Sequence, residues 1–488
     1  MSDARAEETP TPMADDRTES VVTAGRNILH ADASSKYAPT APRYRKPWPD
    51  ALLLLVALIE LLTLFPHNLR GDGAPRFAAL SQLLEGHGIP AIKYSLIGPL
   101  FSAPLWLLGK ATSSPQTLVE VYNWLVFALG LLALYLLLRN VMDRRVLRTF
   151  LLLLVAASMF PAHTLSFYAE TFTAVAVAIG SVLVVFGRRI AALGGWTLAV
   201  LGIANIPATI LGFASMTALY TLRRQRLRYL AAIAAAIALI LAEAWLRRGS
   251  PFANGYAGDS GFHTVMPYSG GPGFNYPILF GILAILLSFG KGLLFFTPGL
   301  FLPARRYLLA QARGAENGAK LYTLYLLWLA FVGGMVIVYA HWWAWYGGWF
   351  WGPRFFLFAS IPAALVLAVR LHARDAGLGA NLLTLAALAL SFWVGVNGVV
   401  FEQQGLDACT AHNYAQEFLC QFTPEFSALW HPFVVYEPLS PGAILYTATS
   451  SAIFLYLALP LLIRMTRQIA DWLRGTAAVY LRREAWRL

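Results

Sequence analysis

The chain has 488 residues, 58% of them hydrophobic and only 13% charged, and its formal net charge is +12. This composition excludes a soluble globular protein, because several apolar runs approach the roughly 20 residues that cross a ~30 Å hydrocarbon core. The positive charge does not indicate nucleic-acid binding, because most lysines and arginines fall in segments that alternate to one side of the predicted membrane. These segments are 1–46, 139–148, 188–189, 223–228, 305–320, 370–374 and 464–487. The positive-inside rule makes that side cytoplasmic, with contact to anionic lipids as a by-product.

The N-terminal segment 1–46 differs sharply from the rest of the chain. It is polar and almost without aromatic side chains, a composition that predicts a disordered tail. It contains no early apolar core of the kind that a signal peptide needs, so the first spanning helix is expected to act as the insertion signal. We place this tail in the cytoplasm.

The remaining chain predicts an all-α integral membrane protein with about twelve transmembrane helices and both termini cytoplasmic. The predicted spans are 49–66, 118–138, 148–165, 167–186, 190–205, 206–222, 228–247, 278–304, 320–341, 354–371, 380–402 and 443–464. The larger external loops are then 67–117, 248–277, 342–353 and 403–442. We expect the protein in the plasma (inner) membrane.

The first external loop contains an apolar segment, 94–108, that is short and interrupted by Pro99 and Pro104. A crossing here would invert the charge bias of every later loop, so we interpret the segment as re-entrant or interfacial. Upstream, the spacing of 74–84 predicts an amphipathic helix that begins near Pro75 and ends before Gly86.

Four regions follow from these spans. They are the tail 1–46, a transmembrane region 47–403 that includes the loop 67–117, an external loop 404–442, and a last helix with a basic cytoplasmic tail, 443–488. The loop 404–442 holds both cysteines of the chain, Cys409 and Cys420. In an oxidising compartment they are expected to form a disulfide, and two free thiols are the alternative.

Two acidic residues lie at the external ends of predicted spans. Asp72, between two glycines, is either an exposed catalytic carboxylate or the N-cap of the following helix. Glu170 either complements a helix dipole or works beside a second acid, where it would orient an acceptor or hold a divalent metal. Glu60 and Glu243 lie inside spans, and we interpret both as polar helix contacts rather than a relay.

The basic residues on the external side are few and stand in apolar surroundings. Lys93 and Lys291 are expected to have a function, because a lysine at such depth is costly unless it snorkels or meets an anion. The stretch around Lys291 is not a nucleotide-binding loop, because the first glycine and the final Ser/Thr of that motif are missing. Arg354 opens a predicted helix, where its guanidinium could clamp a phosphate.

An aromatic run, 341–354, leads up to Arg354. An interfacial aromatic belt explains part of it, but not the paired glycines or the Gly-Pro break. The aromatic faces suit a sugar or a prenyl chain. The candidate substrate-binding residues are Tyr94, His341, Trp343, Tyr346 and Trp349. The histidines show no metal-ligand spacing, so no metal site is predicted from them.

In their order, these motifs resemble a known class of enzymes. The series runs from Gly-Asp-Gly at 71–73 and Lys-Tyr at 93–94 to Tyr-Ala-Glu-Thr-Phe at 168–172. Gly-Lys-Gly-Leu-Leu-Phe-Phe-Thr-Pro at 290–298 and Tyr-Gly-Gly-Trp-Phe-Trp-Gly-Pro-Arg at 346–354 complete it. It is similar to bacterial multi-spanning glycosyltransferases of the GT-C class, which includes protein O-mannosyltransferases and lipid A aminoarabinose transferases.

The resemblance implies a polyprenyl-phosphate-linked sugar donor, an external active site and an inverting transfer in which Asp72 is the general base. Lys93, Lys291 and Arg354 are then candidates for the cations that stabilise the leaving phosphate. Mannosyltransferases often have Asp-Glu where this chain has Asp72 and Gly73, so the sugar is not carried over. The acceptor, whether glycan, lipid or protein, is not fixed either. The resemblance names no cofactor, and dependence on a divalent metal stays open.

Three other functions stay open at this stage. Twelve spans with cytoplasmic ends are also typical of transporters and lipid-linked saccharide flippases, but the unusual charges lie at the external face rather than the midplane. An O-antigen ligase or polymerase also uses lipid-linked sugars, but the loop 403–442 contains neither Arg nor Lys. A noncatalytic scaffold is the third.

Overall fold

The structure is a computed structural model. It describes residues 48–485 except 254, 256–263, 272, 403–406, 408, 411 and 413, and the side chains of α22 up to residue 476. The predicted tail 1–46 lies outside the described residues, which all belong to one unit, Pro47–Leu488. Within them the chain forms helices and two isolated bridges, Asn68 with Ser166 and Met142 with Ala312, and no strand. The all-α fold class is therefore confirmed.

Several helices coincide with predicted spans, and others are shorter or broken. They are α2 Trp48–Thr63, α3 Gly73–Leu84, α4 Ile97–Leu100, α5 Ala103–Thr112, α6 Pro115–Glu120, α7 Tyr122–Leu138, α8 Arg144–Ala156, α9 Phe160–Thr164, α10 Ala169–Phe186, α11 Arg189–Asn205, η1 Pro207–Thr209, α12 Ile210–Arg224, η2 Leu227–Leu230, α13 Ala231–Arg248, α14 Ile278–Leu287, α15 Leu293–Phe296, η3 Pro298–Phe301, α16 Arg305–Gln311, α17 Ala315–His341, η4 Arg354–Ala359, α18 Ser360–Leu371, α19 Leu378–Val400, α21 Glu417–Phe422, η5 Pro424–Phe426, η6 His431–Phe433 and α22 Pro441–Ala485. Among the described residues, seven helical stretches are long and apolar enough to cross a membrane. The other predicted spans are shorter helices or broken ones, so the count of about twelve crossings stays a prediction.

The predicted span over 278–304 is not one continuous helix. The segment divides into α14, α15 and η3. Gly290 lies in the first break, packed so tightly that a Cβ there would lie 2.1 Å from the carbonyl oxygen of Cys420. Pro298 marks the second break, because proline has no backbone N–H to donate within a helix. The breaks leave Lys291 in a turn rather than in a helix.

The apolar segment 94–108 also lacks a continuous helix. It contains α4 and the start of α5, and both helices are much shorter than a bilayer crossing. This agrees with the expectation that the segment does not span. The amphipathic helix predicted over 74–84 is present as α3.

The core that positions the site is built around α10. This helix is almost wholly buried and packs against α7, α11 and α17 and the short helix η4. Gly180 of α10 and Gly195 of α11 let the two backbones approach, because a Cβ on either would lie 2.6 Å from the other's carbonyl oxygen. The packing of α10 against η4 brings Glu170 and Arg354, each near the start of its helix, close together.

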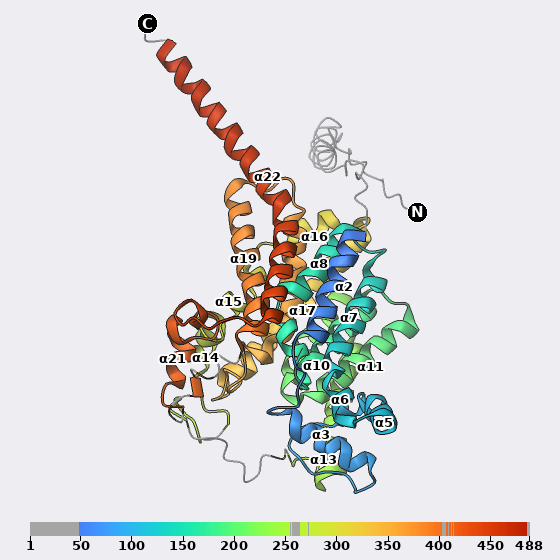
Figure 1. The fold of residues 1–488 in the computed structure, drawn as a ribbon. Helices are drawn as coiled ribbons and strands as arrows, with labels where there is room; N and C mark the ends of the chain where they lie inside the picture. The colour runs from blue at the N-terminus through green and yellow to red at the C-terminus, as the bar shows by residue number, and fades with distance from the viewer. Residues whose placement is uncertain are drawn as a thin grey trace, which may run out of the picture. The chain divides into compact units, whose positions relative to one another are not determined.

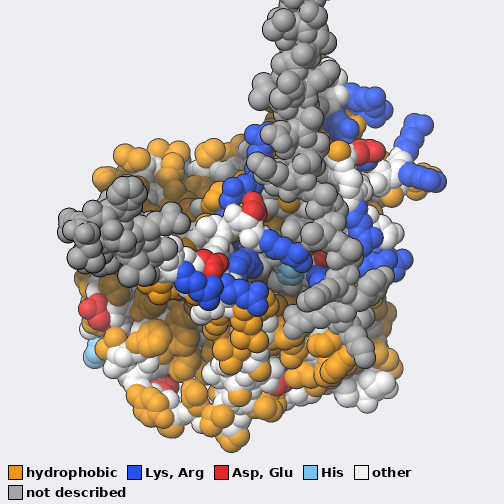
Figure 2. Space-filling view, turned by 90° about the horizontal axis from the view of Figure 1, so that it is seen from above, with side chains coloured by type: hydrophobic (Ala, Val, Ile, Leu, Met, Phe, Trp, Pro, Cys, Tyr) orange, Lys and Arg blue, Asp and Glu red, His pale blue; other side chains and the backbone are white. Residues whose placement is uncertain are grey.

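Charge is distributed unevenly between the two ends of the helices. α16, in the predicted cytoplasmic segment 305–320, and α3, in the predicted external loop, lie at opposite ends (Figure 1). Figure 2 looks onto the end that carries α16, and lysine and arginine side chains gather on this face. The fold thus separates basic loops from α3 as the positive-inside argument requires.

The last predicted external loop is held by a covalent link. Cys409 and Cys420 form a disulfide, and Cys420 lies in α21. The backbone N–H of Gly290 donates to the carbonyl oxygen of Gln421 at 3.1 Å. The disulfide-linked segment therefore packs directly against the turn that contains Lys291.

Candidate active site

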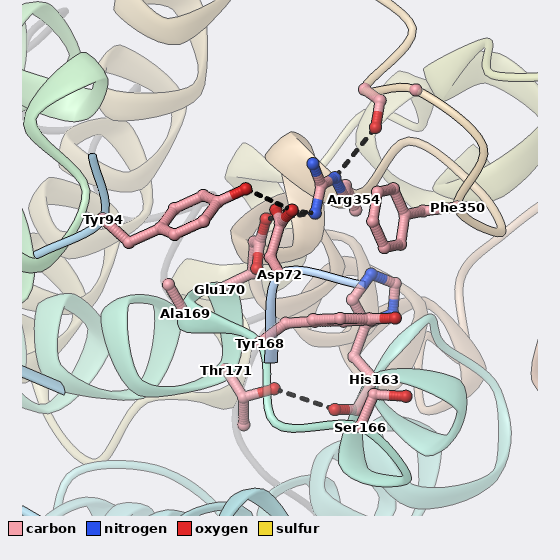
Figure 3. A network of polar contacts seen from close by, with 12 residues as sticks. Asp72, Tyr94, His163, Ser166, Tyr168, Ala169, Glu170, Thr171, Phe350 and Arg354 are labelled. Carbon is pink, nitrogen blue, oxygen red and sulfur yellow. Dashed lines mark hydrogen bonds and ion pairs between the residues drawn. The ribbon is translucent and has the colours of Figure 1, made fainter. Parts of the chain in front are cut away.

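Asp72 occupies the N-cap position of α3, but its side chain accepts no capping hydrogen bond. Its Oδ1 accepts from the hydroxyl of Tyr94 at 2.7 Å, and its Oδ2 accepts from Nη1 of Arg354 at 2.8 Å (Figure 3). Gly71 makes this orientation accessible by adopting a φ of +55° in the preceding turn. The carboxylate therefore serves a polar cluster rather than the helix.

Arg354 joins the two candidate acids. Besides its bond to Asp72, its Nη1 lies 3.7 Å from Oε1 of Glu170. Its Nε donates to the carbonyl oxygen of Gly347 at 2.9 Å, and its guanidinium carbon lies 3.6 Å from the centre of the Phe350 ring. Stacking on Phe350 and hydrogen bonds from two different nitrogens fix the orientation of the planar guanidinium, a role that lysine could not fill.

The surroundings of Asp72 favour its ionised form. Burial by itself raises the pKa of the carboxyl, but the charge of Arg354 and the hydrogen bonds from Tyr94 and Arg354 hold this pKa below its usual range. Its side chain is still 21% exposed, so an incoming group can reach it. An ionised, partly desolvated carboxylate within reach of a hydroxyl is what general-base chemistry requires.

Arg76 is a further member of this cluster, and its place in the sequence did not single it out. It follows Asp72 by one helical turn and is 7% exposed. Its Nη1 donates to the carbonyl oxygen of Ser95 at 3.2 Å, and its guanidinium lies 4.7 Å from the Tyr94 ring centre. Its Nε is buried and has no hydrogen-bond partner within the described protein. The spacing of four residues on one helix was the signal that could have identified it.

The segment that contains Lys93 and Tyr94 is bound by an ion pair at the end of α13, Glu243 with Arg247. Glu243 accepts hydrogen bonds from the hydroxyl of Ser95 at 2.9 Å and from the N–H of Leu96 at 2.7 Å. It also pairs with Arg247 at 2.9 Å. Arg247 in turn donates to the carbonyl oxygens at positions 90 and 92. The segment 90–96 is thereby fixed so that Tyr94 reaches Asp72.

Replacing Glu243 by alanine should destabilise the chain, because Nη1 of Arg247, the hydroxyl of Ser95 and the N–H of Leu96 would lose their acceptor. Breaking a buried ion pair costs about 3–5 kcal/mol of unfolding free energy, which a lower midpoint of thermal unfolding in detergent would report. Glu316→Ala is the matched control, since Glu316 forms the same i,i+4 pairing with Lys320 but is 82% exposed. Equal unfolding midpoints for the two variants would contradict a stabilising role of the Glu243–Arg247 pair.

The remaining predicted residues lie in two neighbouring groups. Trp349 donates to Glu417 at 3.1 Å and stacks on the ring of Tyr414, and Tyr346 is buried in the same aromatic run. His341, at the end of α17, bonds to the carbonyl oxygen of residue 276 at 2.7 Å. The backbone N–H of Trp343 donates to the carbonyl oxygen of Gly273 at 3.0 Å. These contacts join them to the segments 273–276 and 414–417 rather than to Asp72.

Lys291 contacts the loop that leads to Arg354. Its Nζ donates to the carbonyl oxygens of Gly348 at 3.4 Å, Gly352 at 2.9 Å and Phe350. Figure 3 shows Arg354 at the centre of the cluster, with Asp72, Tyr94, Glu170 and Phe350 around it. Lys93 lies beside it, 5.4 Å from the Tyr94 ring centre.

Glu60 has a structural role rather than a role in the cluster. Glu60 accepts from the hydroxyl of Thr449 at 2.6 Å, which makes it a contact between α2 and α22.

Across the described part of the chain, no group of three or more His, Cys, Asp or Glu side chains could hold a metal ion. Asp72 and Glu170 share Arg354 instead.

Neither a protein-family model nor a curated protein matches this sequence. Among solved structures, the chain is similar to the crystal structure of ArnT from Cupriavidus metallidurans bound to undecaprenyl phosphate. The two chains are 14% identical, the match covers 85% of this chain and 77% of ArnT, and the TM-score is 0.45. ArnT is a lipid A aminoarabinose transferase of the GT-C class, the group that the order of motifs indicated. A likeness this remote carries no argument about activity, which has to rest on the site itself.

Proposed function

We propose that this chain is a membrane glycosyltransferase that moves a sugar from a polyprenyl-phosphate carrier to an acceptor hydroxyl. One observation carries the proposal: an ionised, partly exposed Asp72 is held by Tyr94 and Arg354 in a cluster that also contains Glu170. The acceptor is a glycan, lipid or protein. The site lies at the α3 end, so we place it on the external face of the inner membrane with both termini cytoplasmic.

In the proposed reaction the acceptor oxygen attacks the anomeric carbon while Asp72 takes the hydroxyl proton. The bond between that carbon and the phosphate oxygen breaks, and its electron pair leaves with the polyprenyl phosphate. Attack opposite the leaving group inverts the anomeric configuration. Tyr94 orients one carboxylate oxygen and Arg354 the other, so the base is positioned before substrate arrives.

The cations of the cluster suit the leaving phosphate. Arg354 lies against the carboxylates of both Asp72 and Glu170. Arg76 and Lys93 lie beside Tyr94, whose hydroxyl donates to Asp72. This leaves positive charge in excess, and preorganised cations stabilise the negative charge that develops on a phosphate. The buried, unpaired Nε of Arg76 is a ready donor for a phosphate oxygen.

The test of the proposal is to incubate the purified chain with polyprenyl-phosphate-linked sugars and acceptor-containing envelope extract. Mass spectrometry should detect free polyprenyl phosphate and a new glycoside, both in proportion to enzyme. Movement of the intact donor across a proteoliposome membrane without cleavage would instead favour the flippase alternative. A donor that is neither cleaved nor moved would also overturn the proposal.

Replacing Arg76 by glutamine should weaken binding of polyprenyl phosphate about tenfold or more, because a hydrogen bond to a charged group contributes about 1.5–3 kcal/mol. Titration of the purified variant with polyprenyl phosphate measures the change in Kd. Arg139→Gln, on an exposed arginine at the end of α7, should leave Kd unaltered. An unchanged Kd for a folded Arg76 variant would remove Arg76 from the phosphate site.

A further inference from the structure

Lys291 lies in the turn between α14 and α15, in an environment that satisfies its whole ammonium group. Lys291 as a whole residue is 6% exposed. Its Nζ faces the backbone carbonyl oxygens of Gly348, Phe350 and Gly352. A lysine ammonium has only three N–H donors, so these carbonyls use all of them. A phosphate could bind Lys291 only by displacing part of the loop.

The three carbonyls come from one short loop with an unusual backbone. Gly347, Gly348 and Gly352 have φ values of +79°, +75° and +64°, a region that side chains other than glycine rarely occupy. These turns direct alternate carbonyl oxygens toward one point, where they would be buried and mutually repulsive without a donor. Burying a polar group without a partner is unfavourable. The ammonium therefore supplies what a bound cation would supply to such a loop.

The conformation of this loop determines where Arg354 lies. The carbonyl oxygen of Gly347 accepts from Nε of Arg354, and the ring of Phe350 stacks on the same guanidinium. Both contacts come from the loop that surrounds Lys291. Nη1, one of the two other guanidinium nitrogens, is thereby directed at Asp72.

The other side of the Lys291 turn is also fixed. The N–H of Gly290 bonds to Gln421, next to the disulfide of Cys420. Glu417, in the same helix α21, accepts from Trp349 of the loop. The turn and the loop are therefore both anchored to one disulfide-linked segment, and Lys291 bridges them from within.

We propose that Lys291 is a positioning residue whose ammonium acts as an internal cation, folding the loop 347–353 and thereby placing Arg354 on Asp72. This role replaces the phosphate contact that the sequence suggested for Lys291. The expected effect of Lys291 on sugar transfer rests on the proposed function. The effect on the loop is independent of any activity.

Hydrogen exchange in the full chain tests the loop directly. Lys291→Met keeps the length of the side chain but removes its donors, so amides in peptides that cover 343–354 should exchange at least tenfold faster. The matched control is Lys110→Met, since Lys110 is exposed and only lies over Trp106. Unchanged exchange in 343–354 would overturn the proposal. If the methionine variant does not fold, Lys291→Ala with added ethylammonium should regain wild-type protection, and failure to regain it would equally overturn it.

A double-mutant cycle separates positioning from direct phosphate contact. Lys291→Met should lower transfer on the order of 10²-fold, the size of effect that a small misplacement of a catalytic group can have. In an Arg354→Ala background the same change should add little, because residues that act through one another are not additive. Fully additive losses, with a weaker donor Kd in both backgrounds, would assign Lys291 to the phosphate. A wild-type chain without any transfer would refute the proposed function while leaving the exchange result intact.

Discussion

Asp72→Asn should lower sugar transfer by about 10²–10⁴-fold, the usual contribution of a general base. Asparagine has nearly the same shape and its carbonyl oxygen can still accept from Arg354 or Tyr94. It cannot take a proton from the acceptor. Donor binding and the thermal unfolding midpoint should therefore change little, and a radiolabelled-sugar transfer assay should show a loss in kcat.

Asp471→Asn is the matched control for this change, because Asp471 lies exposed in α22 and pairs only with the neighbouring Arg474. It should retain full transfer. An Asp72→Asn chain that transfers sugar at the wild-type rate to a purified acceptor would exclude Asp72 as the base. The cluster would then have to act through another group.

Arg354→Ala is expected to have the second large effect, a loss of transfer of about 10²–10³-fold, since it removes a preorganised cation from the site. It also changes the pH dependence. In the wild-type chain Arg354 holds the pKa of Asp72 below its usual range, against the effect of burial. Without the guanidinium, burial and the nearby Glu170 raise this pKa. The base is then protonated at a higher pH, so transfer is lost earlier as pH falls.

The pH profile of kcat/KM measures this shift. The acidic limb of the variant should lie at higher pH than that of the wild type, while Arg354→Lys, which keeps the charge but not the planar fork, should lie between them. Arg313→Ala, at an exposed position near α16, should have the wild-type profile. Coincident acidic limbs for Arg354→Ala and the wild type would contradict the electrostatic role.

The sequence could indicate Asp72, Glu170 and Arg354 because each is a charged residue beside an otherwise apolar span, where charge is rare. Their convergence depends on the packing of α10 against η4 and on contacts between residues 282 positions apart in the case of Asp72 and Arg354. A hydropathy profile describes only neighbouring residues, so it contains no information about contacts between distant parts of the chain. The catalytic assignment of these residues stays a prediction.

Hydropathy also failed at 278–304, where the average is apolar throughout but Gly290 and Pro298 break the helix. That error concealed the surroundings of Lys291, whose partners are backbone carbonyls about 60 residues later in the chain and carry no side-chain signal. Arg76 was missed for a different reason. Its charge looked like any external arginine until its burial and its contact with Tyr94 were known.

The most direct measurement is an experimental structure of the chain with bound polyprenyl phosphate. The phosphate should lie within hydrogen-bond distance of at least two of Arg76, Lys93 and Arg354, with Asp72 facing the position of the transferred sugar and Lys291 still bound to its loop. A phosphate bound away from this cluster, or at the bilayer midplane as in a transport site, would contradict the account.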